Sequence, residues 1–348
     1  MIKSTVLAVL TAALLAGTAS AQPDAAAGYR LTKSIPLGAP ERWDYVVFDR
    51  AAKRVYVAHG DHVNVVDGTS GAVVGEAPGG PGGVHGIAIS TATGKGYTDD
   101  GQAGVAIAFN LKTLKLVGRI PGQKDADGVT LDRVTGHVFV VNGDSKSLTV
   151  IDPKTDTVVA TIDTGGGLEY AVGAGDGKVY VNGAEKRELL RIDARTNRID
   201  ARWPLPDCQS PHGLAIDRAG HRAFVTCMNR VMMIVNTETG AIVAHLPIGL
   251  GTDAAAFDPK RKLAFSSNAD GTISVVREVD PQTFESAGTI KTRITARTMA
   301  IDPATGRLFV AAAKLDPSAP PPVYIPGHPW RPKLLPGSLE LLFIDPAS

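Results

Sequence analysis

Short apolar runs separated by polar turns repeat along the chain, and residues 127–165 show the pattern most clearly. Apolar residues dominate 129–131, 137–141, 148–151 and 158–162, and Gly, Pro, Asn and Asp fill the turns between these runs. Runs of this length with such turns are typical of short antiparallel strands. Because one four-stranded sheet cannot bury both of its faces, the pattern predicts a unit that packs against copies of itself.

The first strand of this unit recurs at intervals of 41 to 44 residues. Each copy opens with an ionisable residue, and the seven openings are Asp44, His85, Asp127, Glu169, His212, Asp253 and Arg297. Seven copies of a four-stranded unit predict an all-β fold, a seven-bladed β-propeller with antiparallel blades. No segment keeps an apolar period of 3.6 residues for long, which argues against a helical fold.

The two ends of the chain are expected to complete one blade. The seventh copy stops after three strands, the last two of which are expected at 308–312 and 339–345. Residues 30–36 resemble the fourth strand expected at 116–121, and both segments end in Pro. We therefore expect the N-terminal strand to complete the last blade, which would remove the open sheet edges and give one closed, monomeric domain.

One connection of the seventh copy is much longer than the others. Residues 315–338 join its second and third strands and carry eight prolines together with Tyr324, His328 and Trp330. A connection of this length in a compact domain is usually functional or disordered. The sequence leaves open an ordered lid over a binding site and a loose, solvated loop.

Residues 1–21 have the pattern of a secretory signal peptide. Lys3 provides the charged start, residues 6–16 the apolar stretch, and residues 19–21 a small-residue cleavage site. The apolar stretch is too short to span a membrane, so we expect no membrane span and a mature domain over residues 22–348 in the periplasm or outside the cell.

The two cysteines, Cys208 and Cys227, are expected to form a disulfide in such an oxidising compartment. The alternative is that both are buried as small apolar side chains. The chain has 36 basic and 35 acidic residues, so its net charge gives no general reason to bind nucleic acid or an anionic membrane. Nucleic acid is therefore an unlikely partner, and a small molecule is the expected one.

The second and third strands share a signature, clearest in the Val-Phe-Val-Val-Asn-Gly run at 138–143 and in residues 148–162. Shorter forms recur at 179–183 and 55–59. These motifs resemble the YVTN-type, YncE-like β-propeller repeat family of secreted bacterial proteins over about residues 29–347. The resemblance implies the propeller fold, and it implies no residue roles because the family includes binding proteins, lactonase-like and lyase-like propellers and metal-bearing reductases.

Two sets of residues are expected at one mouth of the central channel. The first set is the seven strand openings, which provide four carboxylates, two imidazoles and one guanidinium. The second set closes the second strands and comprises His59, Asp99, Asn142, Asn182, Cys227, Asn268 and Lys314. The alternative is that Asp and His are ordinary turn and cap residues that solvate the mouth.

Carboxylates and imidazoles at one mouth indicate a site for a divalent cation such as Mn, Zn or Ca. We expect its ligands to be His85, His212, Asp127 and Glu169. The residues expected to contact a bound small molecule are Asp44, His85, Asp253, Arg297, Asn142, Asn182, Asn268 and Trp330. Crowded carboxylates also raise one another's pKa, so the catalytic candidates are Asp127, Glu169 and His212.

Two functions remain open on the sequence. One is a binding propeller that holds a small ligand in the polar site formed by these residues at the channel mouth, with or without a divalent cation. The other is a metal-assisted hydrolase or lyase that acts at the same site. Fold alone does not decide between the two.

Overall fold

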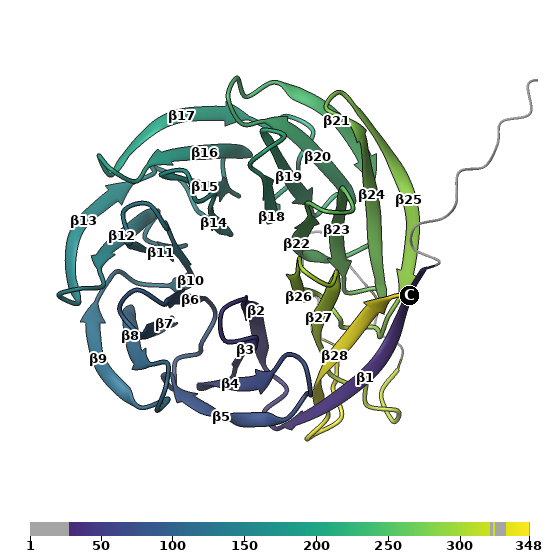
Figure 1. Cartoon of the computed structure of the whole chain (residues 1–348), viewed down its shortest axis with the longest axis horizontal. Helices are drawn as coiled ribbons and strands as arrows, with labels where there is room; N and C mark the ends of the chain where they lie inside the picture. Colours follow the sequence, from purple (N-terminus) through teal and green to yellow (C-terminus); the bar gives the residue numbers. More distant parts are fainter. Residues whose placement is uncertain (1–27, 321–322, 324–331, 348) are drawn as a thin grey trace, which may run out of the picture.

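The computed structural model describes residues 28–320, 323 and 332–347. Within them, seven four-stranded antiparallel sheets are arranged as blades around a central axis (Figure 1). The predicted seven-bladed β-propeller is therefore confirmed. Each blade begins with its innermost strand at the axis and ends with its outermost strand at the rim.

The strands of the first four blades follow one another in sequence. Blade one contains β2 (Trp43–Asp49), β3 (Arg54–His59), β4 (His62–Asp67) and β5 (Val73–Pro78). Blade two contains β6 (Ile87–Ser90), β7 (Lys95–Asp100), β8 (Val105–Asn110) and β9 (Leu116–Pro121). Blade three contains β10 (Ala126–Leu131), β11 (Val138–Asn142), β12 (Ser147–Asp152) and β13 (Thr157–Asp163). Blade four contains β14 (Ala171–Gly173), β15 (Lys178–Gly183), β16 (Glu188–Asp193) and β17 (Arg198–Pro204).

The remaining blades complete the ring. Blade five contains β18 (Pro211–Asp217), β19 (Arg222–Cys227), β20 (Val231–Asn236) and β21 (Ile242–Pro247). Blade six contains β22 (Thr252–Asp258), β23 (Leu263–Asn268), β24 (Thr272–Asp280) and β25 (Thr283–Lys291). Blade seven contains β26 (Thr298–Asp302), β27 (Arg307–Ala312), β28 (Leu339–Pro346) and, as its outermost strand, β1 (Tyr29–Gly38).

The closure of blade seven by the N-terminal strand is confirmed. β1 pairs antiparallel with β28 from Tyr29 opposite Pro346 to Gly38 opposite Leu339, with two register shifts along the way. The two strands lie side by side at the outer edge of that blade (Figure 1). This pairing joins the two ends of the described chain and gives β28 the neighbour it would otherwise lack.

The hydrophobic core lies between adjacent blades. Phe139, Val141 and Leu148 of blade three pack with Val179 and Leu190 of blade four. All five residues of β11 are buried, which explains why its first four residues form an unbroken apolar run and not an alternating one. Because each blade buries its faces against two neighbours, the innermost strands are held in fixed positions around the axis.

The Asp residues that end most innermost strands stabilise the following turn. Asp49 accepts a hydrogen bond from the backbone N–H of Ala51 (2.9 Å), and Asp132 accepts one from that of Thr135 (2.8 Å). Side chains bound to their own turn in this way have a structural role.

The connection between β27 and β28 is described only at its base. A β-bridge joins Leu315 to Leu334, and Lys333 forms an ion pair with Asp316 at 2.8 Å. The proposed lid residues Tyr324, His328 and Trp330 lie outside the described residues, as does the segment 1–21 expected to be a signal peptide. In the described part of the chain, no helix has the length and apolar character needed to cross a bilayer.

Candidate functional site

The propeller gathers the strand openings of six blades into two groups around the axis. Within each group, one oxygen or nitrogen ligand atom from every residue lies within 4.8 Å of the others. The first triad is Asp44, His85 and Asp127, from blades one to three. The second triad is Glu169, His212 and Asp253, from blades four to six.

The four residues expected to ligate one cation are therefore divided between two sites. His85 and Asp127 belong to the first triad, and Glu169 and His212 belong to the second. Blades two and five lie across the ring from each other (Figure 1), so the two imidazoles fall into separate groups. The sequence could place the residues at one mouth, but it could not divide them.

The charges of the two triads act on each other. Burial raises the pKa of Asp44 to about 7, and the charges of Asp253 and Glu169 in the second triad add to this effect against the opposing charge of Arg297. Burial and the neighbouring carboxylates Asp44 and Glu169 also raise the pKa of Asp127 well above its usual value. A concentration of carboxylates with raised pKa values is a site that would gain from a bound cation.

In the first triad, the His85 ring is held on both sides. Its Nδ1 lies 3.1 Å from Oδ1 of the buried Asp99, and its Nε2 lies 3.3 Å from Nη2 of Arg42. Burial lowers the pKa of His85, but the hydrogen bond and charge of Asp99, with the charges of Asp44 and Asp127, raise it to about 9. This imidazole therefore has a neighbour at each ring nitrogen, and the carboxylates around it favour its protonated form.

Asp99 also fixes the backbone at the opening of blade two. Its two carboxylate oxygens accept hydrogen bonds from the backbone N–H groups of His85 (2.9 Å) and Gly86 (2.7 Å). A Cβ atom on Gly86 would overlap the backbone of Gly128 and Val129 in blade three. The small residue after His85 is thus required because the innermost strands approach each other closely.

In the second triad, His212 has one free nitrogen. Its Nδ1 lies 3.2 Å from the backbone carbonyl oxygen of Ser210, and its Nε2 lies 3.6 Å from Oε1 of Glu169. Burial lowers the pKa of His212, but the charges of Glu169 and Asp253 outweigh it and raise the pKa. A histidine that donates from Nδ1 to a carbonyl presents Nε2 to a metal in the usual orientation.

The Cys208–Cys227 disulfide is present and lies beside this triad. It joins the segment before β18 to the end of β19. Ser210, the partner of His212, follows Cys208 by two residues, and the N–H of Met228 donates to the carbonyl of Gln209 at 2.9 Å. The disulfide therefore anchors the segment that orients His212.

Arg297 ties three blades together at the ring. Its guanidinium donates to Asp253 of blade six and to the backbone carbonyl of Trp43 in blade one (3.0 Å), and its Cζ lies 5.6 Å from the centre of the Trp43 ring. The sequence suggested that Arg297 contacts a ligand. The structure places its guanidinium on the second triad and on blade one, where it closes the ring and offsets the charge of Asp253.

The three asparagines expected to contact a ligand are buried within the sheets. Asn142 donates to Ser147 and Thr149 of its own blade, and Asn182 donates to the backbone carbonyl of His212 at 2.6 Å. Asn268 donates to Thr272 and Ser274 of its own blade. Their amide groups thus support the blades, and Asn182 supports the site indirectly through the backbone of His212.

Two tyrosines meet across the axis directly beside the triads. Tyr45 follows Asp44, Tyr170 follows Glu169, and the ring centroids lie 4.5 Å apart in an edge-to-face arrangement. Burial and the charges of Glu169, Asp44 and Asp127 raise the pKa of Tyr45 well above its usual value. The pair thus lies directly beside the carboxylates of both triads. The sequence showed aromatic residues after two strand openings, but it gave no sign that they would touch.

Comparisons with known proteins identify sequence relatives of this propeller. Residues 72–210 match a domain of unknown function, DUF5074. The uncharacterized protein YncE of Salmonella typhimurium (strain LT2) and that of Salmonella typhi are each 27% identical over 190 residues, which is 52% of this chain and 52% of each relative. The chain fits a YncE-like propeller family.

The match spans about half the length of the YncE relatives. Two solved structures resemble this chain over almost its whole length. They are the structure of U3-55K (TM-score 0.75, 92% of this chain and 99% of that one) and the crystal structure of RRP9 WD40 repeats (TM-score 0.76, 93% and 99%). Both are 11% identical to this chain, so the likeness concerns the fold alone.

Proposed function

We propose that this YncE-like propeller is a binding protein that holds a small ligand through a divalent cation at the ring of strand openings. The observation that carries the proposal is the second triad, in which Glu169, His212 and Asp253 bring three ligand atoms within 4.8 Å of one another. Three protein ligands leave coordination positions of a cation open, and a bound molecule fills them.

The chemistry and spacing of the second triad support a cation such as Mn²⁺ or Zn²⁺. One imidazole and two carboxylates form a mixed nitrogen and oxygen set that suits these ions. Two ligands about 2.1 Å from one tetrahedral ion lie about 3.4 Å apart. The separation of 3.6 Å between His212 Nε2 and Glu169 Oε1 is close to that value.

The first triad supports the same function as a neighbouring acidic wall. Asp44 and Asp127 add carboxylates next to the cation. The Tyr45–Tyr170 pair lies beside both triads, since each tyrosine directly follows a triad residue. The ligand that fits is thus a small polar molecule with oxygen atoms able to reach the cation.

The test is cation binding by the full chain after treatment with a chelator. We expect calorimetry to show Mn²⁺ or Zn²⁺ binding, and His212→Ala to weaken it. His245→Ala is the matched control because His245 is an exposed residue on the outermost strand of the same blade. Equal cation affinity in the wild type and in a folded His212→Ala variant would reject the proposal.

A metal-assisted hydrolase or lyase is the second candidate. Its support is that burial and the charges of neighbouring carboxylates raise the pKa of Asp127, a carboxylate beside the proposed cation site, well above its usual value. In this case Glu169 and His212 would hold the cation and Asp127 would transfer the proton. A screen of lactones and esters with and without chelator separates the two, since a binding protein shows no chelator-sensitive turnover.

The disulfide supports a location in an oxidising compartment, which agrees with the proposal that residues 1–21 direct secretion to the periplasm or beyond. Cell fractionation of the full-length chain tests this location. Recovery of the protein in the cytoplasm with reduced cysteines would contradict it.

A further inference from the structure

A second pocket lies at the other end of the innermost strands. Its volume is about 460 Å³, and it is formed by the ends of β2, β6, β10 and β14 in blades one to four. A volume of this size is within the range of small-molecule sites, about 300–1,000 Å³. None of the residues assigned above to the two triads lines it.

The pocket is separate from the ring of carboxylates. In blade one, Asp44 of β2 and Arg50, the residue after β2, are six residues apart, and in blade three Asp127 and Arg133 have the same separation. Six residues of strand span about 20 Å. The Tyr45–Tyr170 pair lies between the two ends, and Tyr170 itself lines the pocket.

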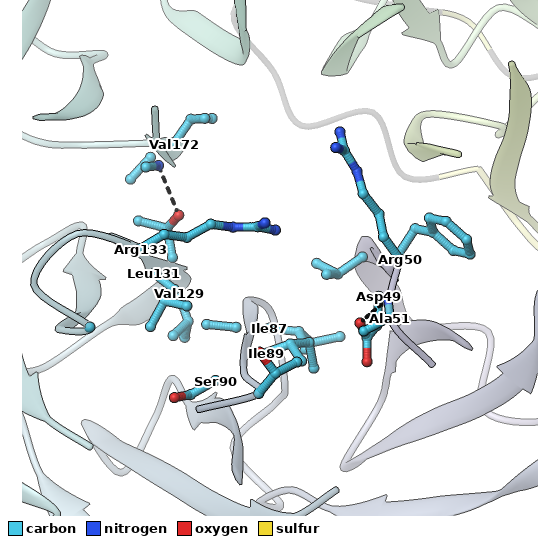
Figure 2. Close-up of a pocket in the computed structure, with 18 of the residues that line it drawn as sticks. Asp49, Arg50, Ala51, Ile87, Ile89, Ser90, Val129, Leu131, Arg133 and Val172 are labelled. Atoms are coloured by element: carbon cyan, nitrogen blue, oxygen red, sulfur yellow. Dashed lines mark hydrogen bonds between the residues drawn. The ribbon is translucent and has the colours of Figure 1, made fainter. Parts of the chain in front are cut away.

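The walls of the pocket combine apolar and polar surface. Ile87, Ile89, Val129, Leu131 and Val172 line it, all from innermost strands (Figure 2). Asp49 is the acidic residue of the lining, and its carboxylate accepts a hydrogen bond from the backbone of Ala51. The five apolar side chains suit the apolar part of a bound molecule.

Two arginines lie on opposite sides of this pocket. Figure 2 shows Arg133 reaching toward the middle of the pocket and Arg50 extending from the other wall. Neither guanidinium forms a hydrogen bond or ion pair with any described residue. Arg218 has the same repeat position in blade five, but it donates to the carbonyl of Gly175 at 2.8 Å. The free guanidinium groups are thus a feature of this pocket and not of the repeat.

The two positive charges act on each other. Burial lowers the pKa of Arg50, the charge of Arg133 lowers it further, and the charge of Asp302 opposes these effects less strongly. Like charges held close together, with neither guanidinium in an ion pair with a described residue, attract an anion, and guanidinium groups bind carboxylates and phosphates with two parallel hydrogen bonds.

We propose that this pocket binds a small organic anion, a carboxylate or a phosphate monoester with an apolar body. The anionic group lies between Arg50 and Arg133, and the apolar body packs against Ile87, Ile89 and Val129. The site is independent of the cation ring, because the tyrosine pair separates the two.

Calorimetric titration of the full chain with benzoate, phenyl phosphate, inorganic phosphate and benzyl alcohol tests the proposal. We expect benzoate or phenyl phosphate to bind at one site per chain, and inorganic phosphate and benzyl alcohol to bind at least about tenfold more weakly because each lacks one of the two features. Affinity is expected to fall as salt increases.

The variants identify the site. Arg50→Gln and Arg133→Gln are each expected to weaken binding about tenfold or more, since each removes a charged hydrogen-bond donor from an exposed position. Arg218→Gln is the control and should bind as the wild type does. The proposal is overturned if neither organic anion binds saturably, if benzyl alcohol binds equally well, or if both pocket variants bind normally while folded.

Discussion

The two triads contain the same chemical groups but hold their histidines differently. His85 has Asp99 at one ring nitrogen and Arg42 at the other, whereas His212 has a backbone carbonyl at Nδ1 and leaves Nε2 toward Glu169. Residues at equivalent repeat positions thus acquire different properties from their neighbours. The pKa values of both imidazoles are raised, but only His212 has a ring nitrogen without a hydrogen-bond partner among the described residues, so the second triad is better arranged for a cation.

Arg297 sharpens the difference between the triads. It pairs with Asp253 and so reduces the excess negative charge of the second triad, while it also connects blades six, seven and one. The first triad has no arginine on its carboxylates among the described contacts. Charge alone would therefore favour the first triad for a cation, and the free imidazole nitrogen favours the second.

The largest expected effect, on both stability and cation affinity, comes from removing the disulfide. This bond lies beside the second triad and has no counterpart at the first. The closed loop spans a sequence separation of 19 residues, so replacing both cysteines with serine should cost about 3 kcal/mol of unfolding free energy. The segment with Ser210 should loosen, and cation affinity should fall with it. Urea unfolding and calorimetry measure both effects, and unchanged cation affinity would show that this segment does not orient His212.

The next effect concerns the loss of cation affinity when each histidine is replaced. His212→Ala should weaken cation binding about 100-fold, because it removes a ligand whose orientation is already set. His85→Ala should weaken it less than about tenfold, because both nitrogens of His85 already have partners. Calorimetry with Mn²⁺ and Zn²⁺ measures the ratio. Equal losses would mean that the triads act as one site.

A smaller effect is expected from Asp99→Asn, which keeps the shape of the side chain and removes its charge. The pKa of His85 should fall by about 1–2 pH units from its value of about 9, since the hydrogen bond and charge of Asp99 raise it. The pKa of His212 should not move. Proton NMR titration of the histidine rings measures both pKa values. An unchanged pKa of His85 in the variant would mean that Asp99 does not raise it.

The smallest effect is on stability and concerns Asp44. Its pKa in the folded protein is about 7, above the value of 3.8 for an unperturbed group, so the folded state binds this proton more tightly than the unfolded state. The associated stability is complete below about pH 4 and is lost as the pH rises through about 7. Asp44→Asn should therefore be more stable than the wild type at pH 8 and similar to it at acidic pH.

Thermal unfolding of the two proteins at a series of pH values, in the presence of chelator, measures this difference. Asp61→Asn is a suitable control because Asp61 is an exposed carboxylate of the same blade whose pKa is lowered. If Asp44→Asn is less stable than the wild type at pH 8, the carboxylate stabilises the fold, and the ring is not electrostatically strained there.

The repeat pattern was sufficient to predict the fold. Seven strand openings at nearly constant spacing, with turns rich in Gly and Asp, specify the blades, and the Pro-ended segment at 30–36 identified the strand that closes the ring. These features are local or periodic, so they can be read without knowing which residues touch. The disulfide could be predicted from two cysteines because no other pairing exists.

The site was predicted only as a set of residues. The sequence placed Asp44, His85, Asp127, Glu169, His212 and Asp253 at equivalent positions, but the division into triads depends on the distances between blades. The partners Arg42 and Ser210 come from segments before the strand openings, and their side-chain and carbonyl directions have no periodic signal. The Tyr45–Tyr170 contact joins residues far apart in the chain and has no local signal.

The sequence by itself thus determined the architecture and the chemical types at each repeat position, because backbone pairing and burial follow short-range patterns of apolar and polar residues. The tertiary structure decided which imidazole nitrogen is free, which arginines lack partners and where the channel is closed. Those properties depend on contacts between blades, where burial and neighbouring charges set the pKa of each group, and residues with the same repeat position have different neighbours there.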